Sequence, residues 1–263
     1  MKVKFALLTF FWVLNFGAIS QATEVQVGAV EQVESRGVLV PIYAVWNKNA
    51  VANLVLYSGG GGGYGVIGAD GWPDSKNFLI RSAKLFAAHP FNVILVGRAT
   101  DMSTLDGATR IGDDHYRDNQ AIFRAIKANN SAPIWLVGTS MGTISVAAAA
   151  TRDTESDIAG IVLTSSVTSH RVPGAVPTQD LGKIRVPVLV VHHERDACKS
   201  CTPFEAKNIA GSLINAPVKK TVLVTGGASA TGGPCEALHY HGFVGMEGET
   251  VDLIANWILH PMR

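Results

Sequence analysis

A serine between two glycines is the first feature of this chain with clear chemical meaning. The stretch Gly138–Gly142 reads G-T-S-M-G, with an apolar run at 133–137 before it and small residues at 143–150 after it. The apolar run predicts a strand, and the small residues predict a helix packed closely on a sheet. In a strand–turn–helix of this kind the glycines allow a sharp turn that exposes the serine Oγ at its tip. The pattern therefore predicts Ser140 as a catalytic nucleophile.

A serine nucleophile needs a base, and the base needs a carboxylate that orients it. After such a turn the expected order is acid and then histidine, each in a loop that follows a strand. Asp196 comes just after the apolar run 186–191 and is the expected acid, with Glu194 as the runner-up. His241 is the expected base, because a glycine and an aromatic anchor follow it in the loop before the closing helix. His239 is the alternative base.

Five consecutive glycines follow Ser58, directly after a strand expected at 51–57. Catalysis by acyl transfer needs two backbone N–H donors aimed at the developing oxyanion. We expect one donor from Met141, the residue after the nucleophile, and the other from Gly60 or Gly61 in the glycine loop. A phosphate-binding loop is the alternative, but no Gly-Lys-Ser/Thr sequence follows these glycines.

The elements that would position these residues alternate along the chain. An antiparallel pair at 25–33 and 38–46 is expected at a sheet edge, followed by strands at 51–57, 92–96, 133–137, 158–163, 186–191 and 221–225. Helices are expected at 74–88, 116–128, 143–150 and 203–214, with a closing helix marked by Val251, Ile254, Ala255 and Ile258. This order predicts an α/β fold with a mostly parallel central sheet and helices on both faces. Ligands bind beyond the carboxyl ends of such strands, where the candidate residues fall.

Length and composition favour one domain with a sizeable core, because the chain has 263 residues of which 47% are hydrophobic.

Residues 1–22 read as a cleavable signal peptide, with a basic start and an uncharged stretch; an uncleaved membrane anchor is the alternative. The expected mature domain is therefore 23–263, secreted or periplasmic and not stably inserted in a membrane. Loss of Lys2 and Lys4 reduces 22 basic residues to 20 against 21 acidic ones. That net charge of −1 gives no reason to expect nucleic acid as a partner.

The chain has three cysteines, Cys198, Cys201 and Cys235. An oxidising compartment favours disulfides, and an odd number leaves at least one thiol unpaired. If Asp196 contacts His241, the loops that carry Cys198 and Cys235 lie side by side, within the reach of a disulfide. We therefore expect a Cys198–Cys235 bond with Cys201 free; the local alternative is Cys198–Cys201.

Taken together, the glycine loop after Ser58, the turn at Ser140, Asp196 and His241 resemble the α/β-hydrolase superfamily over nearly all of the mature sequence. The likeness is to secreted bacterial members of the dienelactone hydrolase and esterase type. It implies hydrolysis of a small ester, thioester or amide through an acyl-enzyme, without cofactor or metal. Acyl transfer by the same residues and a non-catalytic binding protein are the alternatives. Only about 20 residues, 165–185, are available after the strand at 158–163, so we expect little or no lid.

Overall fold

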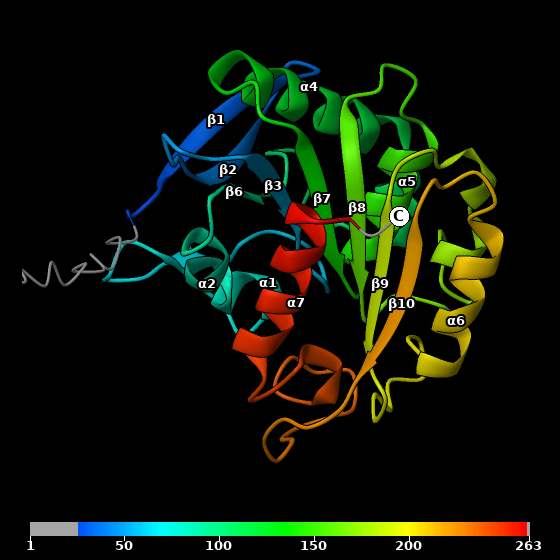
Figure 1. Ribbon diagram of the computed structural model, residues 1–263. Helices are drawn as coiled ribbons and strands as arrows, with labels where there is room; N and C mark the ends of the chain where they lie inside the picture. The colour runs from blue at the N-terminus through cyan, green and yellow to red at the C-terminus, as the bar shows by residue number, and fades with distance from the viewer. Residues whose placement is uncertain (1–25, 262–263) are drawn as a thin grey trace, which may run out of the picture.

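The computed structural model describes residues 26–261, which contain an eight-stranded central sheet (Figure 1). The expected signal peptide, 1–22, lies outside the described residues. The strands follow the order β1-β2-β6-β3-β7-β8-β9-β10. Their bounds are β1 Ala29–Ser35, β2 Val38–Val45, β3 Ala52–Tyr57, β6 Phe91–Val96, β7 Ile134–Thr139, β8 Ile158–Thr164, β9 Val188–His193 and β10 Lys219–Val224. The pairs β1–β2 and β2–β6 are antiparallel, and the other pairs are parallel. The mostly parallel sheet and its antiparallel edge are thus confirmed.

Helices cover both faces of this sheet, as predicted (Figure 1). One face packs against α4 (Asp113–Asn129), α5 (Gly142–Thr151) and α6 (Pro203–Ser212), and the other against α1 (Phe78–Arg81), α2 (Ala83–Ala87) and α7 (Glu247–Leu259). Alternate residues of one strand enter the two cores: Val55 and Tyr57 face the α5 side, whereas Leu54 and Leu56 face the α7 side. The central strands are therefore buried on both sides, which explains their unbroken apolar character.

The structure differs from the sequence prediction between the glycine loop and β6. A single helix was expected at 74–88, but Asp74 belongs to β5 (Pro73–Asp74), which pairs with β4 (Val66–Ile67). The helical segment begins only after Asn77, whose side chain accepts a hydrogen bond from the Leu79 amide and so caps α1. It then breaks at Ser82 into α1 and α2. A further short helix, α3 (Gly107–Ile111), was not expected.

The connection between β8 and β9 contains only two 3₁₀ turns, Val176–Thr178 and Leu181–Lys183. Val176 and Leu181 are buried in the core on the α5 side, so this segment packs onto the body of the domain. It forms no separate lid, in agreement with the prediction. Within residues 26–261, none of the helices combines the length and apolar character needed to cross a membrane.

Candidate active site

Ser140 stands at a sharp turn between β7 and α5, as the sequence predicted. Its φ of 52° places a non-glycine residue in the left-handed region, a conformation that costs free energy and is often found at functional sites. The turn is possible because α5 begins at a glycine: a Cβ on Gly142 would lie 2.0 Å from the carbonyl oxygen of Tyr57. The Ser140 amide donates to the Thr164 carbonyl at 3.0 Å, which ties the turn to β8.

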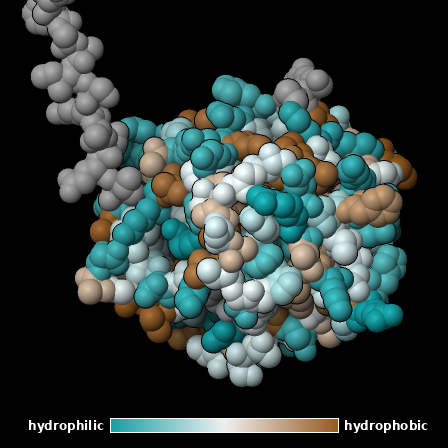
Figure 2. Space-filling model, turned by 90° about the horizontal axis from the view of Figure 1, so that it is seen from below, coloured by the Kyte–Doolittle hydropathy of each residue, from teal (hydrophilic) through white to brown (hydrophobic). Residues whose placement is uncertain are grey.

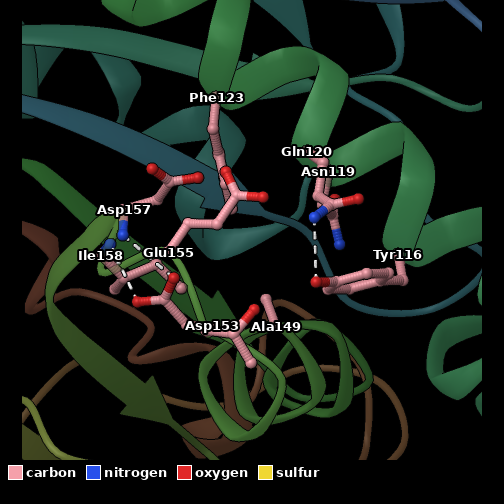
Figure 3. A pocket seen from close by; sticks show the side chains of 10 residues that line it. Tyr116, Asn119, Gln120, Phe123, Ala149, Asp153, Glu155, Asp157 and Ile158 are labelled. Atoms are coloured by element: carbon pink, nitrogen blue, oxygen red, sulfur yellow. Dashed lines mark hydrogen bonds between the residues drawn. The ribbon is translucent and has the colours of Figure 1, made fainter.

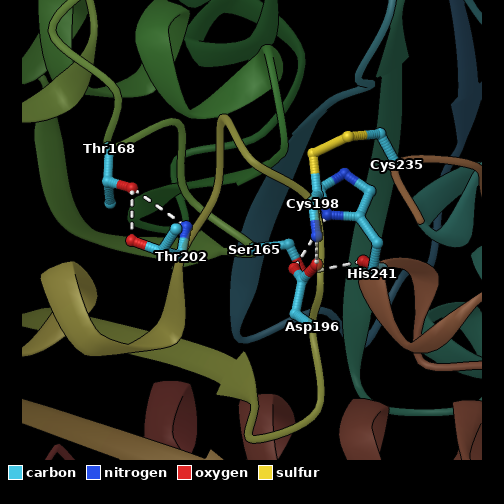
Figure 4. Close-up of a disulfide and its surroundings, with 7 residues drawn as sticks. All are labelled: Ser165, Thr168, Asp196, Cys198, Thr202, Cys235 and His241. Atoms are coloured by element: carbon cyan, nitrogen blue, oxygen red, sulfur yellow. Dashed lines mark hydrogen bonds and ion pairs between the residues drawn. A yellow bond between two sulfur atoms is a disulfide. The ribbon is translucent and has the colours of Figure 1, made fainter.

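Asp196 and His241 meet at the carboxyl ends of β9 and β10. His241 Nδ1 lies 2.8 Å from Asp196 Oδ2, and the two side chains are 5% and 0% exposed (Figure 4). The Cys198 amide donates to the other oxygen, Asp196 Oδ1, at 2.9 Å. The Ser165 hydroxyl donates to the His241 carbonyl at 2.7 Å and holds the base loop from the end of β8. Both groups are therefore fixed from two sides.

The two alternative residues lie elsewhere. Glu194 is exposed, and His239 Nδ1 is buried without a hydrogen-bond partner among the described residues. The His239 ring makes an edge contact with Tyr240. The structure thus brings His241, and not His239, to a carboxylate.

Ser140 and His241 line the same cavity, of about 260 Å³. No hydrogen bond joins the two side chains within residues 26–261. The other lining residues are Gly59, Gly60, Asn77, Phe78, Thr139, Cys235, Ala237 and Gly242. The carboxyl ends of the parallel strands, from which Ser140 and the loops of Asp196 and His241 follow, lie at the lower end of the sheet in Figure 1. Figure 2 looks onto that end, where hydrophobic residues form small separate groups.

The glycine loop packs against the nucleophile, but its glycines have different surroundings. A Cβ on Gly59 would lie 2.9 Å from Ser140 Cβ, and Gly60 lines the cavity. A Cβ on Gly61 would instead lie 2.7 Å from Thr104 Oγ1, so the Gly61 Cα faces a neighbouring loop. The amide N–H groups of Gly60, Gly61 and Met141 take no part in the hydrogen bonds found within the described residues. All three expected donors are therefore available.

A buried polar cluster that the sequence did not predict is in contact with the glycine loop. Arg110 is 2% exposed and donates to the carbonyl oxygens of Leu105, Ser58 and Gly60, at 2.9, 3.2 and 3.2 Å, and to Ser145 Oγ at 2.9 Å. His115 Nε2 lies 2.9 Å from the same Ser145 oxygen. Burial lowers the pKa of Arg110 to about 10 and, with the nearby Arg110 charge, that of His115 to about 3. At neutral pH the arginine is charged and the histidine neutral. Because both lie in a polar stretch of sequence, no pattern marked them as interior.

The cysteines pair as expected: Cys198 is bonded to Cys235, and Cys201 is free and buried. Burial, with a smaller contribution from the nearby Asp196 charge, raises the pKa of the Cys201 thiol to about 12. This thiol is therefore protonated at neutral pH. Ligand atoms of Cys198, Cys201 and His241 lie within 4.8 Å of one another. Since the Cys198 sulfur is committed to the disulfide, the cluster keeps too few free ligands for a structural metal site.

A second cavity lies at the opposite end of the molecule, among Tyr116, Gln120, Asp153 and Asp157 (Figure 3). Its volume is about 10 Å³, which is room for about one water molecule. The Gln120 side chain donates to the Tyr116 hydroxyl at 2.9 Å, and the Asp157 amide donates to Asp153 Oδ1 at 3.0 Å. These groups satisfy one another, so this cavity is no rival for the site at Ser140.

Comparison with solved structures gives the fold a name. The chain resembles an esterase from Pyrococcus furiosus (TM-score 0.62, 10% identity, 88% of this chain and 90% of that one). It also resembles an α/β serine hydrolase without lid from Xanthomonas campestris (0.61, 11%, 90% and 96%) and a dienelactone hydrolase from Anabaena variabilis (0.62, 13%, 90% and 98%). No protein-family model and no curated protein matches the sequence. The structure has the α/β-hydrolase fold, as the resemblance in sequence motifs implied.

The buried His115 predicts a loss of stability in acid. Its pKa of about 3 in the folded protein lies below the value of about 6.5 in an unfolded chain. Between these values the unfolded chain binds a proton that the folded protein does not, so stability falls as the pH falls below about 6.5. From pH 7 to pH 5 the wild type should lose about 2 kcal/mol more free energy of unfolding than His115→Gln, as measured by urea denaturation. Parallel losses in the two proteins would mean that His115 takes up its proton without unfolding.

The disulfide also predicts a measurable share of the stability. The bond joins residues 37 apart in sequence, and the chain-entropy model gives about 3 to 4 kcal/mol for a loop of this size. The double variant Cys198→Ala/Cys235→Ala should lose that much, and Cys201→Ala, which breaks no bond, should lose less. Trypsin cleaves after Lys199 and so separates Cys198 from Cys201. Non-reducing peptide maps should then contain a Cys198–Cys235 pair; a Cys198–Cys201 pair would contradict the structure.

Proposed function

We propose that this protein is a serine hydrolase that cleaves small carboxylic esters through an acyl-enzyme. The observation that carries the proposal is the buried hydrogen bond between His241 and Asp196 at a cavity that Ser140 also lines. Beside a serine, an imidazole that a carboxylate orients can accept the hydroxyl proton and later return it. The solved structures with the same fold include an esterase, a serine hydrolase and a dienelactone hydrolase, which supports hydrolysis as the class of reaction.

In the proposed mechanism Ser140 Oγ attacks the ester carbonyl while His241 takes its proton. Because Nδ1 of His241 faces Asp196, the free Nε2 is the atom that accepts this proton. Asp196 holds the ring in that tautomer and stabilises the imidazolium that forms. The Gly60 or Gly61 amide, together with that of Met141, holds the oxyanion of the tetrahedral intermediate. His241 then protonates the leaving alcohol, and water hydrolyses the acyl-enzyme by the same steps.

The proposed substrate is small and soluble. Next to the cavity at Ser140 lies a groove of about 560 Å³ that shares Gly59 and Asn77 with it and extends past Tyr64 and Met102. This groove gives space for an acyl or alcohol group of moderate size. We further propose that the protein works in the periplasm or outside the cell, because the Cys198–Cys235 bond favours an oxidising compartment.

Kinetics of four variants test the proposal, with p-nitrophenyl acetate and butyrate as substrates. Ser140→Ala should fold normally and lose kcat by about 10⁴-fold or more, since the nucleophile is gone. His241→Ala should be nearly as inactive, and Asp196→Asn comparable or less damaged.

His239→Ala is the matched control, because it removes the same type of side chain two residues away in the same loop. Its kcat should stay near that of the wild type. Substantial esterase activity in Ser140→Ala, or inactivation by His239→Ala but not by His241→Ala, would contradict the assignment. A wild type inert towards all chromogenic esters would favour a binding protein with this fold.

A further inference from the structure

We propose that Arg110 is a positioning residue that aims the amide N–H groups of the glycine loop at the oxyanion. The inference rests on the proposed function, because it assigns a residue to the same reaction. Arg110 is a buried guanidinium with no carboxylate in ion-pair contact among the described residues. Removing an unpaired charge from water costs free energy, which the hydrogen bonds of the guanidinium must offset.

Two of those hydrogen bonds go to the loop that faces Ser140. One terminal nitrogen of Arg110 donates to the carbonyl oxygens of both Ser58 and Gly60, at 3.2 Å each. The other terminal nitrogen donates to Ser145 on α5, and Nε donates to the Leu105 carbonyl. The guanidinium therefore bridges the glycine loop to the helix that follows the nucleophile and to the segment before α3.

The direction of these carbonyls decides the direction of the loop's amides. In a trans peptide unit the C=O and the N–H point to opposite sides, and the described residues contain no cis peptide. The Ser58 carbonyl shares its peptide unit with the Gly59 N–H, and the Gly60 carbonyl shares its unit with the Gly61 N–H. Both N–H groups thus point away from the arginine. Gly61 is one of the two expected oxyanion donors in the loop. The other is Gly60, which lines the cavity, and its N–H belongs to the peptide unit between the two units that Arg110 holds. Arg110 therefore restrains the orientation of both donors.

The loop needs such an anchor because of its composition. Five consecutive glycines have the largest backbone freedom of any sequence, and Gly60, Gly62 and Gly63 all have positive φ. Four other hydrogen bonds restrain the loop: Gly62 N–H to the Gly59 carbonyl, Leu105 N–H to the Gly61 carbonyl, Arg98 to the Gly62 carbonyl and Ser58 Oγ to the Gly63 carbonyl. Among the described residues, the carbonyls of Ser58 and Gly60 accept hydrogen bonds from Arg110 alone. A charged donor also polarises the peptide unit it binds and so strengthens the N–H on the other side.

The groups around Arg110 leave the guanidinium charged and do not form an ion pair with it. His115 is neutral at working pH, and Ser145 Oγ accepts from the arginine while it contacts the imidazole. The Asp106 side chain accepts a hydrogen bond from the Thr109 amide and so caps α3, and it acts on the Arg110 guanidinium only through its charge. No carboxylate therefore takes the N–H groups of Arg110 that donate to the loop carbonyls.

Three variants at position 110 test this role, with kcat and KM measured per active site by burst titration. Arg110→Met removes all donors and should lower kcat by about 10²-fold, the scale of losing one oxyanion donor, while KM changes by less than about threefold. Arg110→Lys should lose less. Affinity for a trifluoromethyl ketone, which binds as a tetrahedral oxyanion adduct, should weaken by a factor similar to the loss of kcat. Added guanidinium chloride at millimolar concentration should restore part of the activity of Arg110→Ala and none to the wild type.

Arg36→Met is the matched control. Arg36 is also poorly exposed, but it pairs with Asp118 and Asp101 away from the cavity. This variant should lower the unfolding temperature and leave kcat per active site unchanged. A folded Arg110→Met or Arg110→Lys with kcat and ketone affinity within about threefold of wild type would overturn the role of Arg110 and leave the proposed function standing. An inert wild type would overturn both.

Discussion

The contact between helix α5 and strand β3 is the constraint on which the rest of the site depends. At Gly142 the helix comes so close to the Tyr57 carbonyl that no side chain fits between them. Tyr57 is the last residue of β3, and the glycine loop begins directly after it. The closeness of this contact therefore places the loop against the turn at Ser140, and Gly59 in its turn has no room for a Cβ beside Ser140. Nucleophile and glycine loop form one corner, in which a small displacement of either would disturb both.

The other half of the site comes from distant parts of the chain and is held by different means. Asp196 and His241 are separated by 45 residues and lie in loops with little regular structure. Two links join these loops to each other and to the sheet: the Cys198–Cys235 disulfide and the hydrogen bond from Ser165 to the His241 carbonyl. Phe243, in a left-handed conformation, packs against Phe78 at 4.8 Å between ring centres and anchors the end of the base loop. Because the domain has no lid, these contacts hold the acid and the base in place.

A feature of the site could be predicted from the sequence when it depends on residues that are neighbours in the chain or on a general rule of the fold. The turn at Ser140 depends on neighbouring residues, so G-x-S-x-G between a strand and a helix was enough to place it. Asp196 and His241 could be predicted because loops after parallel strands converge at one edge of the sheet. Arg110 and Ser165 could not, since their importance arises from backbone carbonyls that are distant in sequence. The break at Ser82 was also hidden, because the apolar pattern of 78–86 continues through it.

The central claim is that Ser140 is a nucleophile activated by His241. Labelling of the purified protein with a fluorophosphonate, followed by mass spectrometry of its peptides, tests this most directly, because the probe reacts with activated serines and needs no knowledge of the substrate. We expect one adduct per chain, on Ser140, with labelling abolished in Ser140→Ala and strongly slowed in His241→Ala but not in His239→Ala. A folded wild-type protein without any adduct, or with an adduct at another serine, would contradict it.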